Sequence, residues 1–468
     1  MTMLTLHEAA ALIPGATVIG DGSAAFARVS TDSRTVGEGD LFVALRGERF
    51  DAHDFLADVA ARGASAALVS REAALPGLPQ LKAADTRAAL GALAHGWRQR
   101  FELPLVAVTG SNGKTTVKEM IASVFAAAVG QDARLSTAGN FNNDIGLPLT
   151  LLRLAPAHRL AVIELGMNHP GETGTLAKIA APTIALVNNA QREHQEFMAT
   201  VEAVALEHAS VIHALGPDGV AVFPADDRYA GIWRVAATGN RIVDFALNDD
   251  GRATPAAVTG TTHGGVLVID TPAGRIEVRL RALGAHNARN ALAATAAALA
   301  AGVEPDAIRA GLEAFEPVKG RLQVKRAVLA SLAGAMLIDD TYNANPDSMR
   351  AAIDVLAQCA APRVLVIGEM GEVGDEGPAF HREIGAYARE RGIDALYATG
   401  EATRDACAAY GAAARHFDEI GALVAALDAA RYGAAATVLV KGSRYTRMER
   451  VVDALTNQPA SGTAPGAH

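Results

Sequence analysis

The segment from Leu103 to Val117, LPLVAVTGSNGKTTV, constrains the fold of this chain more than any other. Its apolar run from Leu105 to Val108 predicts a buried parallel strand, and apolar residues recur at helical spacing after Lys114. A glycine-rich turn joins the two elements. Backbone N–H groups in such a turn, together with the positive end of the helix behind it, attract phosphate. The segment therefore predicts an anion-binding loop in an α/β fold.

Two side chains of this loop have the chemistry of nucleotide binding. The ammonium of Lys114 would reach the outer phosphates, and the hydroxyl of Thr115 would ligate Mg²⁺. This chain has Val108 where the common phosphate-loop pattern has its first glycine. A solvent-exposed turn with a surface lysine is the alternative interpretation, but the strand and helix signals on either side favour the phosphate loop.

Composition limits the classes of protein to which the chain can belong. Its 468 residues are enough for about three domains, and 50% of them are hydrophobic. The net charge of −9 argues against a general nucleic-acid binder. The chain has two cysteines, Cys359 and Cys407, no Lys or Arg before Arg28 and no long apolar run. We expect a soluble cytoplasmic protein without disulfides or membrane insertion, and we expect a monomer.

Strand and helix signals divide the chain into three α/β segments and a tail. The predicted boundaries give an N-terminal domain at residues 1–102, a central domain at 103–322 and a C-terminal domain at 323–456. The tail, residues 457–468, is rich in small residues and proline and is predicted to be disordered.

The N-terminal segment contains a polar turn at Asp32, Ser33 and Arg34. These side chains could grip a polar, anionic ligand. They could equally form a capped, salt-bridged turn, and chemistry alone leaves both interpretations open.

Polar side chains follow the predicted strands of the central segment. The loop of residues 136–146, which includes Asn140, is crowded with amide and carboxylate groups and is expected to face a ligand. Glu164, near the carboxyl end of the predicted strand 160–165, is a candidate Mg²⁺ ligand. His194 follows the predicted strand 183–189, and a structural and a metal-binding role both remain open for it.

Two further residues lie near the end of this segment. Asn287 precedes an alanine-rich helix predicted at 291–301 and could place an amide against a base edge. Arg321, in a linker between two predicted nucleotide-binding units, suits a phosphate clamp, although a solvated arginine is the alternative.

The C-terminal segment alternates strand and helix again. A predicted strand at 336–340 ends in Asp339 and Asp340, a polar loop follows at 341–348, and a helix is predicted at 349–359. Polar residues that follow parallel strands lie where a doubly wound sheet keeps its ligand crevice.

The motifs TGSNGKTT, NFNNDIGLP, VIELGM, GAHNARNALAA and VKGSR together resemble the Mur ligase family over nearly the whole chain. The family's phosphate loop also lacks the first glycine. The resemblance implies three domains: a small N-terminal α/β substrate domain, a central P-loop ATPase-type parallel sheet and a C-terminal Rossmann-like ligase domain. It implies an ATP- and Mg²⁺-dependent amide ligase that works through an acyl phosphate.

The blocks LFVALRGERFDAHDF and DDTYNANPDSM look like the member that adds D-alanyl-D-alanine to UDP-N-acetylmuramoyl-tripeptide, which gives the pentapeptide precursor of peptidoglycan, ADP and phosphate. An Asp-Asn-Pro-Arg block, carried by the sister ligase that adds the third peptide residue, is missing. Alternatives are that sister ligase, a ligase similar to folyl-polyglutamate synthase, or a non-catalytic nucleotide-binding scaffold.

The resemblance also implies a role for each matching position. Catalysis would depend on Lys114, Glu164 and His194, and Mg²⁺ would be bound by Thr115, Glu164 and His194. The residues implied to bind ATP are Gly110, Ser111, Asn112, Gly113, Lys114, Thr115, Thr116, Asn287, Arg321 and Asp339 or Asp340. The residues implied to bind the other substrates are Asp32, Ser33, Arg34, Asn140, Asn343, Asn345, Ser348 and Lys441.

The sequence departs from the family at one position. Several Mur ligases have a carbamylated lysine shortly after the metal-binding histidine, whereas this chain has no lysine between Lys178 and Lys319. Glu207 or His208 would then substitute for it in positioning the metal.

Overall fold

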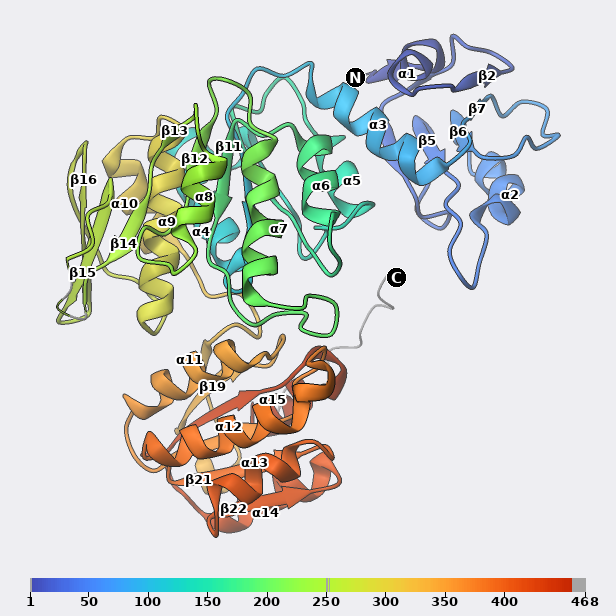
Figure 1. The fold of residues 1–468 in the computed structure, drawn as a ribbon. Helices are drawn as coiled ribbons and strands as arrows, with labels where there is room; N and C mark the ends of the chain where they lie inside the picture. The colour runs from blue at the N-terminus through green and yellow to red at the C-terminus, as the bar shows by residue number, and fades with distance from the viewer. Residues whose placement is uncertain (1, 250, 252, 457–468) are drawn as a thin grey trace.

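The computed structural model describes residues 2–249, 251 and 253–456, and its sheets follow one another along the chain (Figure 1). The order is a five-stranded sheet, a six-stranded sheet with a four-stranded sheet after it, and a second six-stranded sheet. In Figure 1 the C-terminal sheet and its helices, orange to red, lie below the rest of the molecule. The predicted α/β class is confirmed.

The N-terminal part is built on the sheet β2-β7-β6-β5-β4, parallel except for the β2–β7 pair. Thr5 caps the first helix through a capping box with Glu8. The elements are β1 (Leu4–Thr5), α1 (Leu6–Leu12), β2 (Thr17–Ile19), β3 (Ala25–Phe26), β4 (Arg28–Ser30), β5 (Asp40–Val43), η1 (Ala52–Phe55), α2 (Leu56–Ala61), β6 (Ala66–Val69), β7 (Gln80–Lys82) and α3 (Thr86–Arg98).

The central part is built on a parallel sheet in the order β13-β12-β11-β8-β10-β9. The strand that precedes the predicted phosphate loop, β8, therefore lies inside the sheet. The elements are β8 (Leu105–Thr109), α4 (Lys114–Val129), η2 (Gln131–Ala133), β9 (Arg134–Ser136), α5 (Gly146–Leu151), β10 (Leu160–Glu164), α6 (Glu172–Ala180), β11 (Ile184–Val187), α7 (Val201–His213), β12 (Val220–Val222), α8 (Ala230–Ala236) and β13 (Arg241–Ile242).

The strand register sets the level of the functional loops. Val108 pairs with Glu164 of β10, and Thr109 pairs with Val187 of β11. Because the three strands are parallel and in this register, the segments that follow them emerge at the same edge of the sheet.

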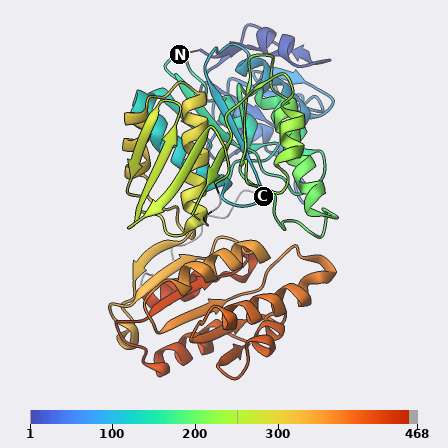
Figure 2. The ribbon, with the colours of Figure 1, turned by 60° about the vertical axis from the view of Figure 1, so that its left-hand side comes forward.

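A four-stranded sheet and two helices complete the central part (Figure 2). They contribute to the core on the α4 face of the parallel sheet, where the small alanines of α9 pack against α4. The elements are β14 (Phe245–Leu247), β15 (Val258–His263), β16 (Val266–Thr271), β17 (Gly274–Val278), α9 (Ala285–Ala300) and α10 (Pro305–Ala314).

The C-terminal part is a sheet in the order β18-β19-β23-β20-β21-β22, parallel except for its first pair, with a core on each face. Its elements are β18 (Gln323–Arg326), η3 (Ala330–Leu332), β19 (Met336–Asp340), α11 (Pro346–Ala357), β20 (Arg363–Ile367), η4 (Gly374–Glu376), α12 (Gly377–Glu390), β21 (Ala395–Thr399), α13 (Thr403–Tyr410), β22 (Ala414–Phe417), α14 (Ile420–Ala430), β23 (Thr437–Lys441), η5 (Arg444–Thr446) and α15 (Glu449–Thr456).

Two predicted helix starts are wrong by several residues. The helix α11 begins at Pro346 rather than 349, because Asn345 caps it and proline is tolerated in the first turn. The helix α9 begins at Ala285 rather than 291, so its polar first turns are helical too. The tail predicted to be disordered lies outside the described residues. None of the helices described is long and apolar enough to cross a bilayer.

Candidate active site

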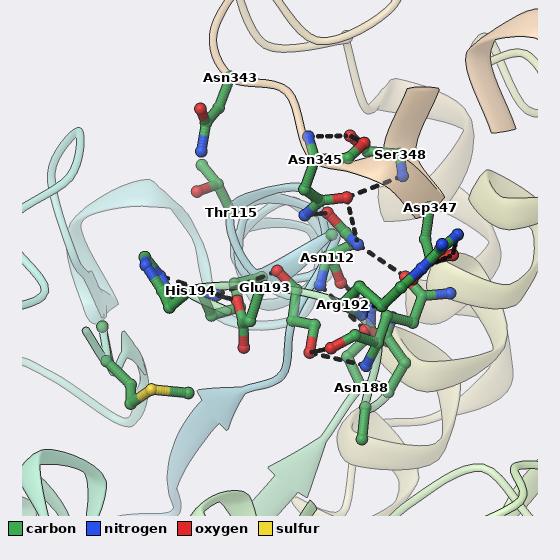
Figure 3. A pocket seen from close by; sticks show the side chains of 18 of the residues that line it. Asn112, Thr115, Asn188, Arg192, Glu193, His194, Asn343, Asn345, Asp347 and Ser348 are labelled. Atoms are coloured by element: carbon green, nitrogen blue, oxygen red, sulfur yellow. Dashed lines mark hydrogen bonds and ion pairs between the residues drawn. The ribbon is translucent and has the colours of Figure 1, made fainter. Parts of the chain in front are cut away.

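A cleft of about 1380 Å³ lies at the carboxyl ends of the central strands and reaches the C-terminal sheet. Its walls include the predicted phosphate loop at 111–116, the segment 188–195 after β11, the linker 320–322 and the loop 342–348 after β19 (Figure 3). Segments predicted separately to face ligands therefore meet around one cavity.

Glycine is required at two positions of the phosphate loop. Gly113 has φ of 81°, and a Cβ there would lie 2.6 Å from Asn290 Oδ1. Gly110 has φ of 135°, and a Cβ there would lie 2.9 Å from the Cβ of Asn188. A side chain would have to displace buried neighbours at both positions, so only glycine lets the main chain pass here.

Lys114 begins α4, and its ammonium folds back over the loop. The Nζ atom donates to the carbonyl oxygens of Gly110 at 2.5 Å and Ser111 at 3.3 Å, and it lies 3.3 Å from Glu193 Oε2. The cation is thus held in the loop by acceptors that an arriving phosphate could replace.

Glu193 is a buried carboxylate that the sequence analysis did not single out. Its Oε1 atom lies 3.0 Å from His208 Nε2, and His208 Nδ1 lies 2.9 Å from the hydroxyl of Thr109. Burial raises the pKa of Glu193, but Lys114, His208 and His194 outweigh this effect and lower the pKa to about 2. The available signal was an acidic residue directly before His194, in the loop after a strand beside the phosphate loop.

Glu164 ends β10 and is buried in the cleft wall. Asn142 donates to its Oε1 at 2.8 Å, whereas its Oε2 is buried without a hydrogen-bond partner. An unpartnered carboxylate oxygen is costly unless a ligand satisfies it, and carboxylate oxygen is the donor that Mg²⁺ prefers. The position of Glu164 therefore fits the predicted Mg²⁺ site.

His194 lies next to Glu193, with φ of 47°. Its Nδ1 atom lies 2.6 Å from Glu372 Oε2, which belongs to the loop after β20, and its Nε2 atom lies 4.0 Å from Glu193 Oε2. The hydrogen bond from His194 lowers the pKa of Glu372. A carboxylate that fixes one imidazole nitrogen orients the other nitrogen, which is the usual support for a metal-binding histidine.

The described residues contain no preformed cluster of three or more His, Cys, Asp or Glu side chains that could hold a metal ion. Thr115 lies in the first turn of α4, Glu164 ends β10 and His194 lies in the loop after β11, and all three line the cleft. A Mg²⁺ ion commonly takes one or two protein ligands and completes its shell with phosphate oxygens and water. This donor set fits such a shared site.

A chain of amides joins the phosphate loop to α9. Asn188 Nδ2 donates to the carbonyl of Asn112 at 2.8 Å and to Asn290 Oδ1 at 2.9 Å. Asn290 in turn donates to Asn287 Oδ1 at 3.0 Å, and Asn287 Nδ2 donates to the carbonyl of Leu283 at 2.8 Å. Asn287 lines the cleft, but both ends of its amide are engaged within the protein, and its contact with a base stays a prediction.

Arg321 reaches the phosphate loop from the linker before β18. Its Nη2 atom donates to the Thr115 hydroxyl at 2.9 Å, and its guanidinium carbon lies 4.0 Å from the centre of the Tyr342 ring. The stacked ring fixes the plane of the guanidinium, so the cation is directed toward the phosphate loop rather than into solvent.

The loop after β19 meets the phosphate loop directly. Asn345 Nδ2 donates to Asn112 Oδ1 at 2.9 Å, and Asn345 Oδ1 accepts from Ser348 N–H at 2.8 Å as the cap of α11 (Figure 3). Lys441 Nζ lies 2.6 Å from Asp340 Oδ2 and donates to the carbonyl of Asn343 at 2.9 Å. All six residues line the cleft.

One expectation is corrected. Asp339 does not line the cleft: its carboxylate lies 2.8 Å from Lys325 Nζ and accepts from the Thr341 hydroxyl at 2.7 Å. Asp340 lines the cleft instead, since neighbouring strand residues point to opposite faces. Glu207 accepts from two backbone N–H groups at the start of α6, and its role in positioning a metal stays a prediction.

Other predicted site residues lie away from the cleft lining. Asp32 and Arg34 form a salt bridge at 2.8 Å in an exposed turn, which matches the alternative interpretation of that segment. The residues that do not line the cleft are Gly110, Asp32, Ser33, Arg34 and Asn140. Ser111, Asn112, Gly113 and Thr116 line the cleft, and their contact with ATP stays a prediction.

Comparison with known proteins matches three domain families in succession. The Mur ligase family catalytic domain matches residues 26–98, the Mur ligase middle domain residues 108–298, and the Mur ligase glutamate ligase domain residues 320–444. The chain is 42% identical over 431 residues to UDP-N-acetylmuramoyl-tripeptide--D-alanyl-D-alanine ligase of Escherichia coli (strain K12), covering 91% of this chain and 93% of the relative.

Two solved structures are similar over almost the whole chain. MurF from Acinetobacter baumannii superposes with a TM-score of 0.89 at 34% identity, covering 98% of this chain and 99% of that one. MurF from Thermotoga maritima in complex with ADP superposes with a TM-score of 0.79 at 25% identity, covering 92% and 97%. The domain matches, the identity and the cleft built around a phosphate loop agree, and this chain belongs to the Mur ligase family.

Proposed function

We propose that this chain is the ligase that joins UDP-N-acetylmuramoyl-tripeptide to D-alanyl-D-alanine at the expense of ATP. The observation that carries the proposal is the direct contact between the phosphate loop and the loop after β19, through Asn112 and Asn345. An ATP-dependent ligase must bring an activated acid and an amine together, and this contact places two ligand-facing loops around one cavity. The curated relative at 42% identity carries the corresponding name.

The reaction requires activation because a carboxylate does not acylate an amine at neutral pH. Transfer of the γ-phosphoryl group to the terminal carboxylate of the tripeptide makes an acyl phosphate, and the dipeptide amine then displaces phosphate. Two anions must approach each other in the first step. Lys114, Arg321 and the N–H groups of the loop offset this repulsion.

The residues that would hold Mg²⁺ are Thr115, Glu164 and His194. Bound there, Mg²⁺ would supply positive charge that offsets the repulsion between the two anionic substrates. Glu372 orients His194 from the C-terminal side, and Asn142 orients Glu164. These contacts orient the metal-binding side chains before the nucleotide binds.

The other proposed substrate-binding residues lie in all three parts of the chain. The N-terminal turn of Asp32, Ser33 and Arg34 would take the uridine end of the long substrate, and Asn140 would contact it further along. Asn343, Asn345, Ser348 and Lys441 would lie near the dipeptide. We retain domain boundaries at 102/103 and 322/323, which fall between the sheets, and we place the reaction in the cytoplasm, where ATP is available.

Phosphate release from ATP tests the proposal. The purified chain is given ATP and Mg²⁺ with each acceptor alone and with both together. We expect release only when UDP-N-acetylmuramoyl-tripeptide and D-alanyl-D-alanine are both present. Release with the corresponding dipeptide precursor and a free diamino acid would indicate the ligase that adds the third residue. Nucleotide binding without release under any combination would indicate a non-catalytic scaffold.

A further inference from the structure

The carboxylate of Glu193 has no role in the reaction as described, although it lies inside the nucleotide site. Its side chain is 5% exposed and lies 3.3 Å from the ammonium of Lys114, the cation that the loop must offer to phosphate. Figure 3 shows Glu193 beside His194 in the wall of the cleft. A negative charge placed here opposes the binding of a polyanion, so it needs an explanation.

A buried histidine on α7 holds the Glu193 carboxylate in position. His208, on α7, is fully buried and bonds to Glu193 Oε1 through one ring nitrogen and to Thr109 through the other. Thr109 is the last residue of β8, directly before the loop. Glu193 therefore cannot turn away into solvent when a nucleotide enters, unlike an acidic residue on a free surface.

The local charges favour one form of nucleotide over the other. Glu193 neutralises Lys114, and Glu164 adds a further carboxylate in the same cleft. A triphosphate without a cation would bring several negative charges next to these groups, where burial strengthens the repulsion. A triphosphate that carries a divalent cation brings positive charge to the same place.

We propose that Glu193, anchored by His208, is a specificity-determining residue that makes this site reject metal-free ATP and accept the divalent-cation complex. The nucleotide site would then be filled only by the form that can react, and Lys114 would leave Glu193 for the phosphate when that form binds. This inference rests on the proposed use of ATP. It differs from a purely structural role for Glu193, which predicts equal effects on both forms of nucleotide.

Equilibrium binding tests the proposal without turnover. Calorimetry on the full chain, without either acceptor, measures the dissociation constant for ATP in excess Mg²⁺ and for ATP in excess EDTA. In Glu193→Gln we expect metal-free ATP to bind about tenfold more tightly than in the unaltered chain, as loss of one nearby charge predicts, while the Mg²⁺ complex changes much less. Glu193→Asp keeps the charge and should keep most of the discrimination.

The control is Glu202→Gln, which removes one negative charge from an exposed position on the helix that carries His208. It should leave both constants unchanged. Glu193→Ala provides a second neutral variant, and thermal melting verifies that each variant is folded. A folded neutral variant that discriminates as strongly as the unaltered chain would overturn the proposal. Failure of the unaltered chain to bind either form would instead overturn the proposed use of ATP.

Discussion

Glu164 keeps a carboxylate oxygen buried without a partner, at the end of a strand whose other residues are all apolar. Such a group costs stability in the free protein because no donor replaces the water that it has lost. Asn142 satisfies the other oxygen and leaves this one directed at the cleft. A position that is unfavourable for folding and favourable for a cation is typical of a functional residue.

Replacement Glu164→Gln should therefore separate activity from stability. We expect phosphate release to fall about a hundredfold or more, because the group that would hold positive charge against the triphosphate is lost. The midpoint of thermal unfolding without ligands should stay the same or rise, because a neutral amide is less costly to bury. Steady-state kinetics and calorimetric melting measure the two effects. A loss of activity that tracked a fall in the melting midpoint would contradict the functional role.

Lys114 is the second residue whose role a single change can test. Lys114→Ala removes the ammonium group that the loop carbonyls hold near the expected phosphate position. We expect turnover to fall by at least about a hundredfold, because this positive charge would no longer stabilise the transferred phosphoryl group. Circular dichroism should show an unchanged fold. Lys178→Ala is the matched control, since Lys178 is an exposed lysine in the last turn of α6. Normal turnover in Lys114→Ala would refute the phosphate-binding role.

At the scale of elements, the sequence predicted the strands that depend on local runs of apolar residues. The strands β8 and β19 lie where apolar runs predicted them. The pairing of Glu193 with His208 could not be predicted, because it joins the loop after β11 to a face of α7 and only the folded sheet brings them together. The same holds for Asp339 and Asp340, whose directions depend on strand orientation rather than on order in the chain.

The start of α11 connects local capping to the contact across the cleft. Asn345 caps the helix through its Oδ1 atom and contacts Asn112 through its Nδ2 atom. Asn345→Asp keeps the cap and loses the donor, so hydrogen exchange of the Ser348 amide should stay slow while turnover falls. Asn345→Ala should lose both, at a local cost of about 1 kcal/mol.

Thr5→Ala is the control for capping alone. Thr5 caps α1 in the same way but lies away from the cleft. Its loss should speed exchange of the Glu8 amide without changing turnover. Asn112 Nδ2 also donates to Asn345 Oδ1 at 3.3 Å, a bond that aspartate can keep. If Asn345→Asp and Asn345→Ala both retained full activity, the contact between the two loops would have no part in the reaction.

At the scale of the whole molecule, the three parts are joined unequally. One continuous core runs from the N-terminal sheet through α3 to α5 and α6 of the central part. The C-terminal sheet has its own cores, and polar contacts join it to the central part. Figure 1 shows the same division, with the C-terminal part attached below the other two. Relative motion is therefore expected at the C-terminal side of the cleft.

Arg192 is the main polar link across this boundary. Its guanidinium lies 2.6 Å from Asp347 Oδ1 and 2.7 Å from Glu383 Oε2, and its backbone N–H donates to Asp347 Oδ2 at 2.8 Å. Arg350 contacts the same Glu383 carboxylate at 3.2 Å. Paired and partly buried charges of this kind hold two surfaces in a defined orientation more strongly than an isolated surface pair does.

Replacement Arg192→Ala should loosen the C-terminal part, because Asp347 would lose its cation and Glu383 would keep only Arg350 of its own part. We expect solution scattering of the free protein to give a larger radius of gyration. Turnover should fall about fivefold or more, which is the effect of a typical coupling free energy between two parts of a protein. High salt should also raise the radius of gyration of the unaltered chain and lower its turnover, but by less, because salt only screens the ion pairs. Arg404→Ala, which breaks ion pairs within the C-terminal part alone, should change neither quantity. If scattering from Arg192→Ala matched that of the unaltered chain, the ion pairs of Arg192 would not determine the orientation of the two parts. That orientation would then depend on the linker at Arg321 and on the contact between Asn112 and Asn345.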